Sequence, residues 1–217
     1  MPTVSLSKLK ESVYSQIDDN TLFFTDTEVT WAINEAIRLG NLFCGWITGT
    51  LDAPNGGTTI ADRVVYRVPY EMAVPQKVVF EGKELDKVGL FQLFRGWPDW
   101  MKDTTATTGD PVARWCPYAL DRIILHPADA VGGGLLQITG IVTPDELVSD
   151  TDTISIPKTA ITMIADYAAH IVQCKLGNVP LTQSMPMYRS YEALIKQYRI
   201  WSNYKQPNFW LDERAPE

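Results

Sequence analysis

The stretch SIPKTAITMIADYAAHIVQCKLGN (residues 155–178) carries the strongest helix signal in the chain. Pro157 suits the first position of a helix, where its missing N–H is not needed, and Gly177 suits the position just past the end. Apolar residues between them recur at helical spacing and form a wide stripe: Ile161, Ile164, Ala165, Ala168, Ile171 and Val172. The many alanines predict that a neighbouring helix approaches closely.

A second helix is predicted after this one. The linker NVPLTQSMP (178–186) leads into MYRSYEALIKQYRIW (187–201). Large apolar residues recur there at helical spacing: Tyr188, Tyr191, Leu194, Ile195, Tyr198 and Trp201. We therefore expect residues 158–204 to form a helical hairpin, followed by an extended tail over residues 205–217.

Two further helices are predicted in residues 1–50, as a second hairpin. The first has apolar residues at helical spacing, after Ser5 as a possible cap: Leu6, Leu9, Val13 and Ile17. The second begins at TDTE, where Thr25 stands three residues before Glu28, the spacing of a capping box. Its apolar face contains Val29, Ala32, Ile33, Ala36 and Ile37.

Residues 51–157 differ from both ends, because glycine and proline are frequent and the β-branched runs are short. RVVYRVP (63–69) predicts a strand, and VVFEGKELDKV (78–88) predicts a hairpin that turns at Gly82-Lys83. LFQLFRGWPDWM (90–101) predicts a short helical turn followed by a loop. Short strands at this density indicate a small sheet or a sandwich.

Three successive glycines, Gly132 to Gly134, lie between the apolar segments RIILHP (122–127) and LLQITGIVTP (135–144). A phosphate-binding loop of the Walker type needs a lysine and a helix directly after the glycines. Here no lysine follows, and the next residues predict a strand. We therefore interpret the glycines as positions of positive φ in the long turn of a hairpin.

The predicted fold class is α+β. The N- and C-terminal helices are expected to bury their apolar stripes against each other as an antiparallel helical bundle. The β-rich insertion, over residues 51–157, forms a small sheet or sandwich that projects as a second lobe, and the tail extends beyond the last helix.

The composition is that of a globular chain: of 217 residues, 45% are hydrophobic and 21% charged. The formal net charge is −7 and no run of basic residues occurs, which argues against a protein that binds DNA through its phosphates. Three well-separated cysteines argue for a reducing compartment. The start of the chain does not resemble a signal peptide, and no apolar run approaches the roughly 20 residues of a membrane span. We expect a soluble protein made in a cytoplasm.

No catalytic constellation is found in the sequence, so we expect neither an enzyme nor a cofactor. Asp166, His170 and Cys174 are spaced four residues apart on one helix face. One helix rarely supplies three metal ligands, and no second cluster completes a tetrahedral site. We therefore expect no metal, with Asp166 pairing with His170 and Cys174 packing as a small hydrophobic residue.

Aromatic residues provide the candidate binding sites. In the tail, Phe209, Trp210 and Leu211 interrupt a polar segment, and such residues anchor many interfaces. They contact a neighbouring subunit or another partner, or they fold back onto their own helices. In the insertion, four aromatic residues favour an alternative function, a binding module for a carbohydrate or peptide: Trp97, Trp100, Trp115 and Tyr118.

Taken in order, the elements of this chain resemble the head-to-tail adaptor (connector, or neck) proteins of short-tailed phages, which join the portal to the tail. The resemblance rests on the order of several weak elements: DTEVTWAINEAIRLGN, VVFEGKEL, LFRGWPDWM, GDPVARWCPYALDRIILHPAD, LLQITGIVTPDEL, DTISIPKTAITMIADYAAHIV and YRSYEALIKQYRIW. Two features have no clear counterpart in that family. They are the spacing of Trp97 and Trp100 and the linker at residues 178–186.

The resemblance implies a structural virion protein without catalytic activity or cofactor. Such a protein forms a dodecameric ring beneath the portal protein, at the neck of the virion, after synthesis in the host cytoplasm. Its helices line or flank a channel through which DNA passes as cargo, and its β-rich lobe faces outward or down toward the tail tube or nozzle. The resemblance also makes Phe209, Trp210 and Leu211 candidate portal contacts. A ring of this kind needs two different faces on each subunit.

Overall fold

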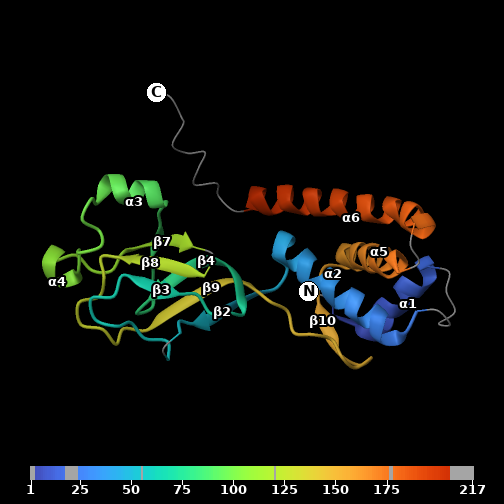
Figure 1. Cartoon of the computed structure of the whole chain (residues 1–217). Helices are drawn as coiled ribbons and strands as arrows, with labels where there is room; N and C mark the ends of the chain where they lie inside the picture. Colours follow the sequence, from blue (N-terminus) through green and yellow to red (C-terminus); the bar gives the residue numbers. More distant parts are fainter. Residues whose placement is uncertain (1–2, 18–23, 55, 120, 176–177, 206–217) are drawn as a thin grey trace. The chain divides into compact units, whose positions relative to one another are not determined.

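The computed structural model describes residues 3–17, 24–54, 56–119, 121–175 and 178–205 (Figure 1). The chain divides into two compact units. Met1–Ile47 and Pro144–Glu217 form the first, here called the helical unit, and Thr48–Thr143 form the second, the β unit. The β unit is therefore an insertion between the two ends of the chain, as predicted, but it ends at Thr143 rather than at residue 157.

The helical unit is a bundle of helices from both ends of the chain, which confirms the predicted fold class. Its helices are α1 (Leu6–Ile17), α2 (Asp26–Cys44), α5 (Lys158–Cys174) and α6 (Asn178–Lys205). Helix α5, which contains the stretch quoted first above, packs against α1, α2 and α6. It is thus the shared element through which the two ends of the chain are joined.

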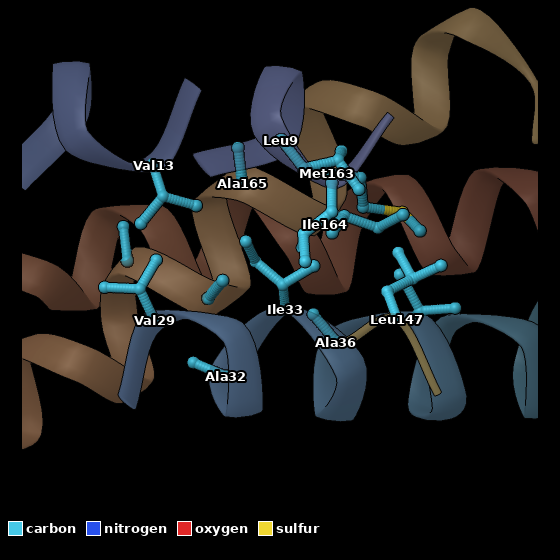
Figure 2. Packing of buried hydrophobic residues seen from close by; sticks show 14 of the residues in the cluster. Leu9, Val13, Val29, Ala32, Ile33, Ala36, Leu147, Met163, Ile164 and Ala165 are labelled. Atoms are coloured by element: carbon cyan, nitrogen blue, oxygen red, sulfur yellow. The ribbon is translucent and has the colours of Figure 1, made fainter. Parts of the chain in front are cut away.

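Small residues of α5 allow this close packing. Ala160, Ala165, Ala168 and Ala169 are completely buried. Figure 2 shows side chains from α1, α2 and α5 meeting in one cluster, with Leu147 beside them: Leu9, Val13, Val29, Ala32, Ile33, Ala36, Met163, Ile164 and Ala165. Of the stripe predicted for α5, Ile161 and Ile171 are only partly buried, because the buried face is centred nearer to Ala165 and Ala168.

The predicted capping box at the start of α2 is confirmed. The Thr25 hydroxyl accepts a hydrogen bond from the Glu28 N–H, and the Glu28 carboxylate accepts one from the Thr25 N–H, at 2.9 Å. At the other end Gly45 adopts a left-handed conformation, with φ 63°, and its N–H donates to the Asn41 carbonyl. These local signals fix where the helix begins and ends.

Residues after the β unit return to the helical unit before α5 begins, and this is why the insertion is shorter than predicted. Strand β10 (Thr153–Ser155) pairs antiparallel with β1 (Thr3–Ser5), and Ile154 joins the bundle core. The Asn34 side chain on α2 both donates to the Leu147 carbonyl and accepts from the Leu147 N–H, at 2.9 and 3.0 Å. Backbone hydrogen bonds and apolar contacts therefore tie residues 147–156 to the helices.

The β unit is a sandwich of two sheets. One has the strand order β2 (Thr48–Asp52), β9 (Leu136–Val142), β4 (Met72–Phe80) and β5 (Lys83–Glu84). The other has the order β3 (Val65–Arg67), β8 (Arg122–His126), β7 (Arg114–Ala119) and β6 (Asp86–Lys87). Inward-facing residues of both sheets share one core that contains Tyr66, Val78, Trp115, Ile123, Leu136 and Ile138.

Two short helices belong to the same unit. The first, α3 (Leu90–Gly96), packs Leu93 and the following Trp100 against the outer face of the second sheet, and the other is α4 (Thr105–Thr108). The helical turn predicted within residues 90–101 is therefore confirmed. The predicted hairpin β4–β5 is also present, but its two-residue turn is Glu81-Gly82, where both residues have positive φ.

Residues 122–144 do not form the predicted hairpin. Strands β8 and β9 both exist, but they lie in different sheets, so the connection between them crosses the sandwich. The buried carboxylate of Asp129 organises this connection, because it accepts hydrogen bonds from the Thr59 hydroxyl at 2.6 Å and the Val131 N–H at 3.1 Å. Gly132 has φ +76°, and a Cβ there would stand 2.6 Å from the Ala61 nitrogen.

Candidate interaction surfaces

The tail residues predicted to bind a partner, Phe209, Trp210 and Leu211, lie outside the residues that the structure describes. Their role therefore stays a prediction. Among the described residues, candidate interaction surfaces occur on each of the two units.

The helix face considered for a metal has other partners. The Asp166 carboxylate accepts hydrogen bonds from Gln16 Nε2 at 2.8 Å and from the Ser190 hydroxyl at 2.9 Å. His170 Nδ1 lies 2.8 Å from the Ser184 hydroxyl. The predicted pairing of Asp166 with His170 is therefore wrong, and so is the predicted packing of Cys174, which is exposed. Among the described residues no group of three potential metal ligands is found.

One buried histidine–carboxylate pair occurs in the β unit. His126 Nε2 lies 3.1 Å from Asp103 Oδ2, and the Trp97 ring lies against the imidazole, with 5.1 Å between ring centroids. His126 is only 2% exposed. Its Nδ1 has no hydrogen-bond partner in the described part of the chain. Because the imidazole is enclosed by its own sheet and by Trp97, we interpret the pair as a link between β8 and the loop that follows α3.

Two cysteine thiols, Cys44 and Cys116, are not activated. Burial raises the pKa of Cys44 to about 12 and also raises the pKa of Cys116. Both thiols therefore stay protonated at neutral pH, and a thiol is a far weaker nucleophile than a thiolate.

The aromatic cluster proposed for carbohydrate binding is mostly core. Trp100 is 2% exposed and Trp115 1% exposed. Trp97 is half-buried, with the Arg114 guanidinium 4.2 Å above its ring. Tyr118 is the exposed member of the four. A sugar stacks on a free aromatic face, so this cluster offers one such ring rather than four.

An apolar strip lies on the exposed side of α2, here called the α2 strip. Trp31 is 58% exposed, and Leu42 and Phe43 are also exposed. Trp31 and Leu42 are eleven residues apart, which places them three turns apart on the same side of the helix. Between them, Arg38 forms an ion pair with Glu35 at 2.8 Å. The charged pair lies on the same side of the helix and separates the two apolar side chains, and a mixture of exposed apolar and charged residues of this kind occurs in many protein–protein contacts.

A second apolar surface lies on the β unit, here called the α3 patch. Phe91 is 77% exposed and Met101 61% exposed, and Phe94 is also exposed, with its ring edge-on to Trp100 at 5.6 Å between centroids. The buried Trp100 thus supports an exposed surface of large apolar side chains. Exposed groups of this kind mark interaction sites in soluble proteins.

An open groove of about 830 Å³ lies in the β unit, beside strand β3. The floor and walls include Trp100, Met101 and Tyr118, and three arginines line it: Arg63, Arg67 and Arg122. Pairing of β3 with β8 sets Arg67 directly opposite Arg122. This register brings together arginines that are far apart in the sequence, so no sequence motif could have located the groove.

The groove carries an excess of positive charge. Asp121 lies 3.9 Å from Arg67 Nε and 3.7 Å from Arg122 Nε, so one carboxylate lies between two guanidinium groups. Arg63 donates from Nε to the Val65 carbonyl at 2.9 Å and lies 5.5 Å from the centre of the Tyr66 ring. Among described residues, no carboxylate lies within ion-pair distance of Arg63. The groove can therefore attract a negatively charged ligand, in a chain whose net charge is −7.

Comparison with known proteins adds no assignment: no family model matches the chain, and no curated protein is significantly similar to it. Within the part of the chain that the structure describes, no helix combines the length and the apolar character required to cross a membrane.

Proposed function

We propose that this protein is a structural component of a phage virion, a head-to-tail adaptor that binds as a ring beneath the portal protein. It extends the DNA channel and provides the docking surface for the tail, at the neck between head and tail. The sequence resemblance is the origin of the proposal. The observation that carries it in the structure is the presence of different exposed apolar surfaces on the two units, the α2 strip and the α3 patch.

The chain organisation supports the proposal. A bundle made from both ends of the chain is a rigid scaffold, because α5 packs on α1, α2 and α6 at once. The inserted β unit begins and ends at neighbouring strands, since β2 and β9 pair in one sheet. A scaffold with an inserted second unit provides one body for the ring and another for the next component of the particle.

The surfaces also suit a closed ring. A ring made by rotation needs two dissimilar faces on each subunit, one for each neighbour, and further surface for the components above and below. Exposed aromatic residues such as Trp31 and Phe91 are the kind that dominate the binding energy of interfaces. In this proposal the α2 strip contacts neighbouring copies or the portal, and the α3 patch contacts the tail tube or nozzle.

The acidic balance suits a channel through which DNA passes without being held. With 26 acidic and 19 basic residues, the chain repels phosphates on average. DNA is therefore cargo rather than ligand in this proposal, and no cofactor and no membrane is involved.

The proposal is tested by mixing the purified full chain with the portal protein of the same phage and measuring assembly by native mass spectrometry. We expect a ring of defined copy number on the portal. Replacing Trp31 and Leu42 together by serine should abolish that ring. Replacing Phe91 by serine, which removes the most exposed side chain of the α3 patch and leaves the groove lining unchanged, should leave the ring intact but weaken attachment of the tail component.

A matched control is Val148→Ser, which removes a 78% exposed apolar side chain of the helical unit outside either surface. It should leave both assembly steps unchanged. Absence of this protein from the necks of purified virions, or turnover of a small molecule by the pure protein, would contradict the proposed function.

The alternative function, a non-catalytic module whose β unit binds a carbohydrate or peptide, receives no support from the aromatic cluster that suggested it. Trp100 and Trp115 are core residues. A glycan array probed with the full chain distinguishes the two: binding of a defined sugar would favour the module.

A further inference from the structure

The basic groove of the β unit and the end of the chain have opposite chemistry. Arg63, Arg67 and Arg122 line the groove, beside the exposed apolar surface of Met101. After α6 ends at Lys205, twelve residues follow, QPNFWLDERAPE. They contain three acidic residues and one basic residue, and the apolar group FWL stands directly before Asp212 and Glu213.

The chemistry of this segment matches that of the groove lining. An apolar anchor followed at once by two carboxylates needs an apolar recess that adjoins guanidinium groups. Met101 and Tyr118 provide the exposed apolar surface, above the buried Trp100, and beside it lie Arg67 at the last position of β3 and Arg122 at the first position of β8. Arginine binds carboxylates with two parallel hydrogen bonds, so this pairing is directional as well as electrostatic.

We propose that the groove of one copy of this protein binds residues 209–213 of a second copy. Phe209, Trp210 and Leu211 supply the anchor, and Asp212 and Glu213 meet Arg67 and Arg122. This deepens the proposed function, because it assigns the tail to the neighbouring subunit rather than to the portal. The tail contact itself does not depend on the adaptor function. Only the statement that this contact closes a ring rests on the proposed function.

The size of both partners fits the contact. A groove of about 830 Å³ accommodates several side chains, since ligand sites of about 300–1,000 Å³ hold a whole small molecule. Twelve residues in an extended conformation would span up to about 40 Å. A segment that leaves one subunit and binds the next gives the two dissimilar faces that a ring needs.

One arginine of the groove is held in place before a ligand binds. Arg63 lies against the Tyr66 ring and donates to the Val65 carbonyl. Arg67 and Arg122 lie 3.9 and 3.7 Å from the exposed Asp121 carboxylate, and exposed ion pairs of this kind constrain side chains little. Both guanidinium groups can therefore turn from Asp121 toward a carboxylate of the ligand.

The direct test is a titration of a fluorescent synthetic peptide, residues 205–217, with the full chain. The chain carries Phe209→Ala and Trp210→Ala, so that its own tail does not compete. We expect saturable binding that weakens as salt is raised. Replacing Arg67 and Arg122 by glutamate should weaken it by at least about tenfold, because two attractive charges become repulsive.

The matched control is Arg95→Glu, which makes the same change of charge at an exposed arginine of α3 that does not line the groove. It should leave peptide affinity within about twofold of the parent. The replaced arginines are all exposed, and a circular dichroism spectrum verifies that each variant is folded. No binding at peptide concentrations up to about 1 mM, or equal binding to the groove variant, would overturn the proposal.

A mixing experiment decides whether the contact joins two copies. One full-length variant has the groove changed (Arg67→Glu with Arg122→Glu), and the other has the tail changed (Phe209→Ala with Trp210→Ala). We expect neither to associate with itself, whereas the mixture forms pairs in analytical ultracentrifugation, because the intact groove of one meets the intact tail of the other. A peptide that binds while the mixture stays monomeric would place the contact within one chain and overturn the proposal.

Failure of this proposal and failure of the proposed function are distinguishable. Rings that form on the portal with a groove variant would overturn the tail contact and leave the adaptor function standing. Peptide binding by a protein that is absent from virion necks would support the tail contact and contradict the adaptor function.

Discussion

Lys10 on α1 and Asp150, which follows the β unit, form an ion pair 2.6 Å long between residues 140 positions apart in the chain. Asp26, at the first turn of α2, lies 2.6 Å from the same ammonium group. The Lys10 side chain is buried, whereas both carboxylates are about two-thirds exposed. One cation therefore links α1, α2 and the segment that returns from the β unit.

The first prediction follows from this asymmetry. Replacing Asp26 and Asp150 together by asparagine leaves a buried ammonium group without a counter-ion, and we expect it to lower the free energy of unfolding by about 2 kcal/mol. Replacing Lys10 by methionine leaves two carboxylates that water can solvate, and should lower it by less than about 1 kcal/mol. Urea denaturation at pH 7 measures both changes.

The control for this pair is Glu84→Gln, which breaks the exposed ion pair between Lys77 and Glu84. Exposed pairs contribute little, so the change should stay within about 0.5 kcal/mol. If Lys10→Met proves more destabilising than the double asparagine variant, the view that burial of the ammonium group dominates is wrong.

The second prediction concerns acid stability and Asp129. Burial alone would raise the pKa of Asp129, but hydrogen bonds from Thr59, Val131 and Gly132 outweigh it, and the pKa falls below the ordinary value of 3.8. A carboxylate with a lowered pKa contributes stability above its unfolded-state pKa, and the contribution disappears as pH falls through the folded-state pKa.

Asp129→Asn should therefore lower the free energy of unfolding by about 1–3 kcal/mol at pH 7, and the difference from the parent should shrink at pH values below 3.8. Urea titrations at pH 7 and at low pH measure the difference. Asp110→Asn, at an exposed position, serves as the control and should not change it at either pH. A difference that grows on acidification would contradict the assigned role.

Neighbouring glycines give the third prediction. Gly132 and Gly133 both have positive φ, +76° and +84°, but only Gly132 has atoms close to where a Cβ would stand. Gly133→Ala should cost only the backbone strain, about 1 kcal/mol. Gly132→Ala adds a collision with the Ala61 backbone and should cost about 1–3 kcal/mol more. Thermal unfolding measures both, and equal effects would mean that the backbone near Ala61 yields easily.

The same loop shows why part of the fold could not be predicted from sequence. Strands β8 and β9 were recognisable from their apolar runs, but a hairpin and a crossover between sheets have the same local pattern. What distinguishes them is the pairing of the strands, since β8 lies between β3 and β7 and β9 lies between β2 and β4. The buried hydrogen bond between Thr59 and Asp129, 70 positions apart in the chain, holds the connection between the sheets. By contrast, the capping box of Thr25 and Glu28 acts within one helical turn, and the sequence alone predicted it.

The interaction surfaces divide in the same way. The exposed residues of α3 lie in a segment whose helical turn is predicted by the sequence. The spacing of its apolar residues does not indicate that Trp100 is buried while Phe91 is exposed. The groove depends on the register that sets Arg67 against Arg122, which is a tertiary property. Local periodicity predicts elements, and the pairing of strands decides which side chains meet.

The fourth prediction concerns the alanines of α5, on which the bundle depends. Ala168 is completely buried where α5 packs among the other helices, and Thr162 lies on the exposed side of the same helix. Ala168→Leu should destabilise the protein by about 1–3 kcal/mol or more, because the added side chain forces neighbouring helices apart. Thr162→Leu adds a similar side chain at an exposed position, and should stay within about 0.5 kcal/mol of the parent. Urea denaturation of both variants, followed by circular dichroism, measures the difference in the free energy of unfolding.

Equal stability of the two variants would contradict this prediction, because it would mean that the bundle can widen around Ala168. Close packing of the alanines would then not be what holds the two ends of the chain together.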